Sequence, residues 1–124
     1  MTSNRKPILV VAMLALFFRV ATGQGTSISA PQAKDHMGEN ATVCGDVVST
    51  HYAERSPGNP TFINLDKPYP NQLFTILSWG SDRAKFGDPE EKYRNKHVCV
   101  TGKISVYRGS PEVVAHESSQ VKVQ

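Results

Sequence analysis

The chain has few of the residues on which most metal sites depend. Its 124 residues include only two cysteines, and there is no Cys-x-x-Cys or His-x-x-x-His pair. A structural zinc site normally takes four nitrogen or sulfur ligands at close spacing in the sequence. Scattered surface residues are the better explanation of the four histidines, His36, His51, His97 and His116. We expect neither a metal nor any other cofactor.

Recognisable catalytic motifs are missing as well. The sequence contains no Gly-x-Ser-x-Gly elbow, no Gly-x-x-x-x-Gly-Lys phosphate loop and no His-Glu-x-x-His helix. The adjacent acids Glu90 and Glu91 are followed closely by Lys92 and Arg94, a pattern typical of a solvated helix face. We expect no catalytic residues and predict that the protein is not an enzyme. A metal-dependent cleavage assay would separate this prediction from a nuclease.

Long apolar runs are absent beyond the first 20 residues. Arg5 and Lys6 precede an apolar run from Pro7 to Phe18, and small residues follow at positions 21–23. This layout predicts a secretory signal peptide over residues 1–23. The alternative is a membrane anchor, but the run is shorter than the roughly 20 residues that a bilayer span needs. We expect a protein exported to the periplasm or secreted, with a flexible leader over residues 24–30.

The remaining chain has no excess of charge. Of the 14 lysines and arginines, three (Arg5, Lys6 and Arg19) lie in the expected signal, which leaves 11 against 11 aspartates and glutamates. Nucleic-acid affinity depends mainly on neutralised phosphates. Any binding of a polyanion would therefore need a local basic patch.

Alternating apolar and polar residues predict strands in the rest of the chain. The expected strands cover residues 41–52, 61–66, 72–79, 97–107 and 112–116, after a short helix that begins at Pro31. A helical connection is expected over residues 80–96, where Asp88-Pro89 resembles a helix start. This order predicts an all-β fold over residues 31–124, a five-stranded OB-fold barrel. The alternative is a sandwich, which usually has about seven strands.

The two cysteines lie on the polar sides of their strands. Cys44 alternates with Val43 and Gly45, and Cys99 lies between Val98 and Val100. The first and fourth strands of an OB barrel are neighbours, so the two sulfurs can meet and we predict a Cys44–Cys99 disulfide. The alternative is a redox-active or metal-binding thiol pair.

Aromatic residues beside cations are the candidate binding residues. They lie at the loop that follows the first strand, and along the fourth strand to its tip: Tyr52, Arg55, Lys103, Tyr107 and Arg108. In an OB barrel these loops border the face on which bases stack. Phe62, Phe74 and Trp79 could add stacking rings, but aromatic residues of small barrels more often fill the core.

The last hairpin carries a resemblance to known proteins. Residues 98–113, VCVTGKISVYRGSPEV, resemble the Val-x-Val-x-Gly-x-Ile-x-x-Tyr-x-Gly-x-Pro-Gln-Ile pattern of OB-fold nucleic-acid-binding domains of the anticodon-binding and exonuclease-associated type, with Glu112 in place of the glutamine. Residues 41–48 and 61–66 resemble the first and second strands of those domains. Residues 33–121 are similar to small exported bacterial proteins described as OB-fold or DNA-binding.

The resemblance implies binding of single-stranded DNA or RNA. Tyr107, Arg108, Lys103, Tyr52 and Arg55 would carry that function, the cations on phosphates and the rings under bases. The alternative is a periplasmic interaction module that binds an envelope protein or a glycan, since OB folds also bind such partners.

Overall fold

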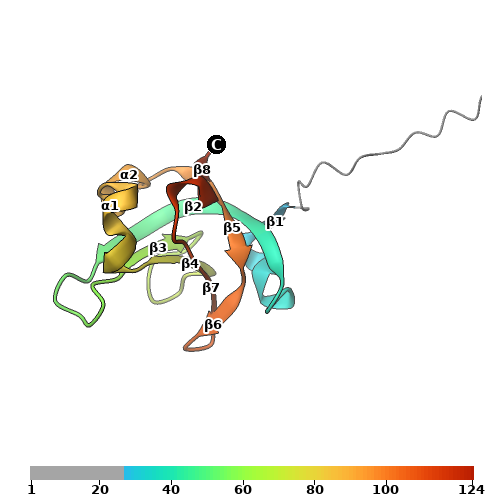
Figure 1. Cartoon of the computed structure of the whole chain (residues 1–124). Helices are drawn as coiled ribbons and strands as arrows, with labels where there is room; N and C mark the ends of the chain where they lie inside the picture. The colour runs from blue at the N-terminus through green and yellow to red at the C-terminus, as the bar shows by residue number, and fades with distance from the viewer. Residues whose placement is uncertain (1–26) are drawn as a thin grey trace, which may run out of the picture.

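The computed structural model describes residues 27–124, and the expected signal peptide lies outside the described residues. The described chain is mostly β-structure, with short helices between the strands (Figure 1). The elements in chain order are β1 Ser27–Ser29, η1 Ala30–Asp35, β2 Asn40–Tyr52, β3 Thr61–Leu65, β4 Phe74–Ser78, η2 Gly80–Asp82, α1 Arg83–Phe86, α2 Pro89–Lys92, β5 His97–Lys103, β6 Ser105–Tyr107, β7 Ser110–Val114, η3 Ser118–Gln120 and β8 Val121–Val123. No helix within this part of the chain is long and apolar enough to cross a membrane.

The expected strand count of five is wrong, because the sheet has eight strands in an open path. Its order is β6-β7-β4-β3-β2-β5-β8, with β1 beside β2. The expected fourth strand is divided at Ile104, whose backbone bonds the turn before β2: its N–H donates to the carbonyl of Glu39 and its carbonyl accepts from Gly38. The other two extra strands, β1 and β8, are three-residue segments that join the sheet edge.

The helices occupy the expected places but differ in detail. The first, η1, is a 3-10 helix rather than an α-helix, and it places Ala30 and Ala33 against the core. The connection from β4 to β5 contains η2, α1 and α2, which put Phe86 and Tyr93 into the core. Figure 1 shows this connection and η1 at opposite ends of the long curved strand β2.

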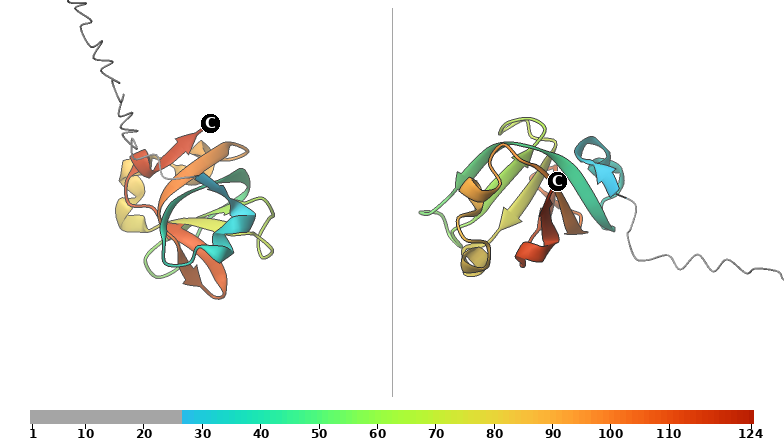
Figure 2. Two further views of the ribbon diagram at one scale, coloured as in Figure 1. Left: turned by 90° about the vertical axis from the view of Figure 1, so that its right-hand side faces the viewer. Right: turned by 90° about the horizontal axis from the view of Figure 1, so that it is seen from above.

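The core lies on the inner sides of the strands. On β2, Val43 and Val47 are buried while Asp46 is exposed, which confirms the expected alternation. Gly102 on β5 allows β7 to approach, since a Cβ atom there would lie 2.6 Å from a methyl carbon of Val113. The two views of Figure 2 show the strands wrapping around this interior.

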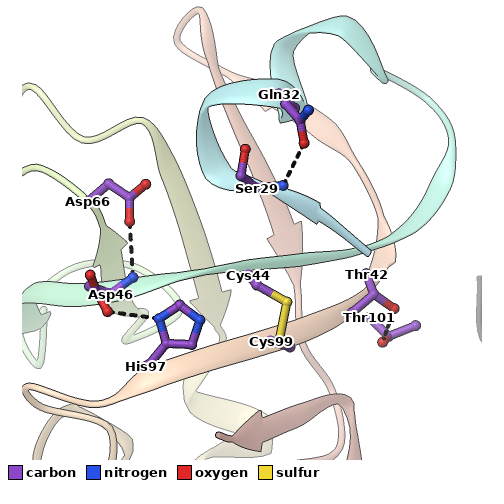
Figure 3. Close-up of a disulfide and its surroundings, with 9 residues drawn as sticks. All are labelled: Ser29, Gln32, Thr42, Cys44, Asp46, Asp66, His97, Cys99 and Thr101. Atoms are coloured by element: carbon purple, nitrogen blue, oxygen red, sulfur yellow. Dashed lines mark hydrogen bonds and ion pairs between the residues drawn. A yellow bond between two sulfur atoms is a disulfide. The ribbon is translucent and has the colours of Figure 1, made fainter. Parts of the chain in front are cut away.

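The first half of β2 is joined to β5 by three pairs of side chains (Figure 3). Cys44 and Cys99 lie directly opposite and form the predicted disulfide. On one side of it the hydroxyls of Thr42 and Thr101 are 2.8 Å apart, and on the other an oxygen of Asp46 lies 2.8 Å from Nδ1 of His97. The segment expected as a flexible leader also contributes here, because residues 27–29 form β1 against Thr42, Val43 and Cys44.

Reduction of the disulfide is expected to destabilise the fold strongly. The bridge spans 55 residues, for which the chain-entropy relation gives about 4 kcal/mol in the free energy of unfolding. Urea titrations of the oxidised protein and of a Cys44→Ala/Cys99→Ala double variant would measure this difference. Dithiothreitol should lower the midpoint of the wild type and leave that of the double variant unchanged. Equal midpoints for oxidised and reduced wild type would contradict the expectation.

Candidate functional site

The side of β2, β3, β4, β7 and β6 that points away from the core is called here the outer face, and several of its central side chains are themselves buried. Its residues alternate with the core residues of the same strands and align in two rows across the registers. One row contains His51 followed by three apolar residues, Phe62, Leu77 and Val114, and the polar row contains Ser49, Asn64, Thr75, Glu112 and Ser105. A sheet surface with side chains in register can contact a ligand across several strands.

Hydrogen bonds run through the polar row in one direction. The hydroxyl of Thr75 donates to Oδ1 of Asn64 at 3.1 Å, and Nδ2 of Asn64 donates to the hydroxyl of Ser49 at 3.0 Å. The backbone N–H of Tyr69 also donates to Ser49, at 3.2 Å, so the loop between β3 and β4 folds over that end of the row. The buried Asn64 and Thr75 are therefore held in fixed orientations.

Glu112 lies on the other side of Thr75 and is the exception in the row. It is only 7% exposed, yet its carboxylate receives no hydrogen bond from residues 27–124. Burial raises the pKa of this carboxyl, because removal from water disfavours the charged form. A carboxylate in such a setting marks a candidate site. The sequence showed Glu112 only as a departure from the family pattern, since burial on an outer face has no local sequence signal.

The predicted binding residues lie at two ends of the sheet, and Tyr52 is on the opposite side of β2 from the outer-face residue His51. Tyr107 pairs with Ser110, and extending the β4–β7 register places Ser110 level with Leu73. Tyr52 is level with Ser78, through Thr61. Five residues of β4 separate these levels, about 17 Å at roughly 3.4 Å per residue. The structure therefore brings Tyr107 and Arg108 together but not Tyr52 and Arg55 with them.

At the hairpin tip, Tyr107 is 49% exposed and Arg108 lies with its guanidinium carbon 5.3 Å from the centre of that ring. Tyr69, which the sequence analysis did not select, lies in the loop at the same end of β4 and is 71% exposed. Lys103 is exposed at the end of β5, opposite Asn40. The tip itself therefore has one exposed ring and one cation, while Tyr69 meets Ser49 on β2, with β7, β4 and β3 between that strand and the strand of Tyr107.

Tyr52 and Arg55 have different surroundings. The guanidinium carbon of Arg83 lies 3.6 Å from the centre of the Tyr52 ring, so one face of the ring is covered. Arg83 also donates to both carboxylate oxygens of Glu90, at 2.8 and 2.6 Å, and this pairing lowers the pKa of Glu90. Arg55 is exposed in the loop that follows.

The apolar candidates are divided between core and surface. Phe74 is fully buried in the core, whereas Phe62 is half-buried on the outer face beside Leu77. Trp79 is 39% exposed and lies over Gly58, where a Cβ atom would be 2.9 Å from the indole ring. Among residues 27–124, no group of three or more His, Cys, Asp or Glu side chains is arranged to hold a metal ion.

Comparison with known proteins supports the fold. No protein family and no curated protein matches the sequence. Among solved structures, it is similar to an aspartyl-tRNA synthetase from Leishmania major Friedlin (TM-score 0.52, 9% identity, 85% of this chain and 22% of that one). It is also similar to an asparaginyl-tRNA synthetase from Pyrococcus horikoshii (TM-score 0.50, 15% identity, 77% and 22%).

A third similar structure is of nearly the same size as this chain. It is the OBody AM1L10 bound to hen egg-white lysozyme, with a TM-score of 0.51, 14% identity, and coverage of 73% of this chain and 82% of that one. This chain spans about a fifth of the length of the two synthetases, so the similarity to them concerns one domain. These likenesses confirm the expectation of an OB-type fold.

Replacement of Arg83 is expected to destabilise the fold. Arg83→Ala leaves Glu90, whose side chain is 17% exposed, without its partner. Loss of hydrogen bonds to a charged group of this kind costs about 2 kcal/mol. Chemical denaturation of Arg83→Ala beside Arg94→Ala would test this, because Arg94 pairs with Glu91 at the exposed surface, where a pair contributes less than about 1 kcal/mol. Equal losses would contradict the assignment.

The pH dependence of stability tests the environment of Glu112. Its raised pKa means that the folded state binds the proton more tightly than the unfolded chain does, so this group favours folding less as pH rises above the ordinary value of about 4.3. Glutamine stays neutral at every pH. The melting temperature of Glu112→Gln minus that of wild type should be more positive at pH 7.5 than at pH 3.5.

A matched control is Glu54→Gln, which removes the same charge from an exposed loop. Its melting-temperature difference from wild type should vary less between the two pH values. If the two variants behave alike, Glu112 is not destabilised by burial.

Proposed function

We propose that this protein is an exported OB-type module that binds single-stranded nucleic acid on its outer face. The observation that carries the proposal is the exposed ring at the hairpin tip, Tyr107, with Arg108 beside it. A second exposed ring, Tyr69, lies in the loop that meets Ser49 at the β2 side of the face. Stacking of a base on an aromatic ring contributes about 1–3 kcal/mol and is available to every base.

The polar row gives the face a rigid base. Asn64 and Thr75 are buried and hold Ser49 through their mutual hydrogen bonds, so a ligand that meets Ser49 would not have to order it. Arg108 beside the Tyr107 ring, and the exposed Lys103 at the end of β5, would bind phosphates. Tyr52 and Arg55 would contact only a ligand that runs about 17 Å along the sheet and continues around the end of β2, because Tyr52 is on the opposite side of that strand from His51.

The similar structures support this proposal to a limited extent. Two of them are named as aminoacyl-tRNA synthetases, and the module would use the same fold toward a nucleic acid. The fold alone does not determine the ligand. The proposal therefore rests on the rings, the cations and the polar row rather than on the likeness.

A fluorescence anisotropy titration with a labelled mixed-sequence 12-mer tests the proposal. At 20 mM salt the wild type should bind, and binding should weaken at 150 mM salt because phosphate contacts release counterions. Tyr107→Ala should weaken binding by about 1–3 kcal/mol, and Arg108→Ala should reduce the slope of log affinity against log salt by about one. Absence of binding at 20 mM salt would refute the proposal.

Lys122→Ala provides the matched control for the arginine. Lys122 is an exposed cation on β8, an edge strand on the far side of β5 from β2, and its removal changes the net charge equally. Its salt slope should equal that of the wild type. A similar reduction in both variants would indicate a general charge effect instead of a contact at the tip.

A second candidate function is the binding of an envelope protein or a glycan. The balance of 11 positive and 11 negative side chains beyond residue 23 favours it, and the OBody that binds lysozyme shows that this kind of fold can present a protein-binding face. Capture from a periplasmic extract with and without nuclease treatment distinguishes the two. A partner retained after nuclease treatment supports the second candidate.

A further inference from the structure

The Glu112 carboxylate lies in the polar row between two hydroxyl groups, and neither donates a hydrogen bond to it. Thr75 on β4 and Ser105 on β6 are its direct cross-strand neighbours. The proton of Thr75 is donated to Asn64, and that of Ser105 points to the backbone carbonyl of Glu112 at 3.5 Å. Each hydroxyl has a single proton to donate. The carboxylate is therefore left as an acceptor without a donor.

The carboxylate is largely removed from water but still reaches the surface. Glu112 is 7% exposed, its oxygens are not among the fully buried atoms without a partner, and burial raises the pKa of its carboxyl. Buried charges are normally paired or hydrogen-bonded. An acceptor at the surface that the protein itself does not satisfy is available to a donor that arrives with a ligand.

Aromatic surface lies close to this acceptor. Tyr107 is two residues from Ser105 on the same strand, so its side chain emerges on the same side as that of Ser105. Diagonal neighbours on one face of an antiparallel pair are about 7–8 Å apart, within reach of an aromatic ring. A flat group stacked on Tyr107 can therefore direct its edge toward Glu112.

We propose that Glu112 accepts a hydrogen bond from the edge of a base stacked on Tyr107 and selects bases that carry an exocyclic amino group, such as cytosine, over thymine and uracil. This inference rests on the proposed function. Cytosine presents an N4 amino donor at the position where thymine presents the O4 acceptor. An ionised carboxylate accepts a hydrogen bond from the first and repels the second.

Two homopolymers test this selection directly. Anisotropy titrations at pH 8 and 20 mM salt would compare labelled dC12 with dT12, which have the same charge and length. The wild type should bind dC12 about tenfold more tightly, the discrimination expected of one well-placed pair. Glu112→Gln should reduce the ratio toward one, because the amide can both donate and accept. Glu54→Gln should keep the wild-type ratio.

The possible outcomes separate this inference from the proposed function. Equal binding of dC12 and dT12 by the wild type, or preference for dT12, overturns the selection by Glu112 and leaves nucleic-acid binding intact. Failure of both oligonucleotides to bind overturns both. If, in addition, a labelled Gly-Lys repeat peptide binds wild type but not Glu112→Gln, the carboxylate serves a basic protein segment and base selection is refuted.

The folding of the variant is checked without an oligonucleotide. The far-UV circular dichroism spectrum of Glu112→Gln should match that of the wild type, and its melting curve should show that it is folded at the titration temperature. A Glu112→Ala variant then gives a second reading, since it removes the acceptor without adding a donor. It should lose affinity for dC12 more than for dT12, and equal losses would contradict the inference.

Discussion

The structure depends on one long strand, β2, that forms hydrogen-bond ladders with two different strands. The 13 residues of β2 pair with β5 through their first half and with β3 through their second half. The register shift between Val47 and Ser49 marks the change of partner. The Cys44–Cys99 bridge fixes the first ladder, so the position of the second, which carries the outer face, is determined with it.

The parts of the fold that could be predicted from the sequence are those set by local pattern. Alternation around Val43 and Cys44 indicated the inner and outer sides, and the disulfide was predicted from that and from the strand order. The break at Ile104 could not be predicted, because it arises from backbone hydrogen bonds to the distant Gly38–Glu39 turn. The short strands β1 and β8 likewise exist through their partners.

Only part of the candidate site could be predicted from the sequence. Tyr107 and Arg108 stand next to each other in a turn, and a turn between two strands is a local signal. Tyr69 comes from a loop more than 30 residues earlier, and the covering of Tyr52 by Arg83 joins two elements that no periodicity connects. Contacts between such distant segments are set by the sheet topology, and a pattern of apolar residues does not reveal that topology.

The polar row has a consequence for how a ligand can lie. Ser49 accepts from both Asn64 and Tyr69, so its own hydroxyl proton remains to be offered outward, whereas Glu112 at the far side of Thr75 can only accept when ionised. The outer face therefore has a donor pole and an acceptor pole. A chain-like ligand with different groups at its two ends would therefore bind in one orientation, in which its acceptor meets Ser49 and its donor meets Glu112. In the opposite orientation neither pair could form a hydrogen bond.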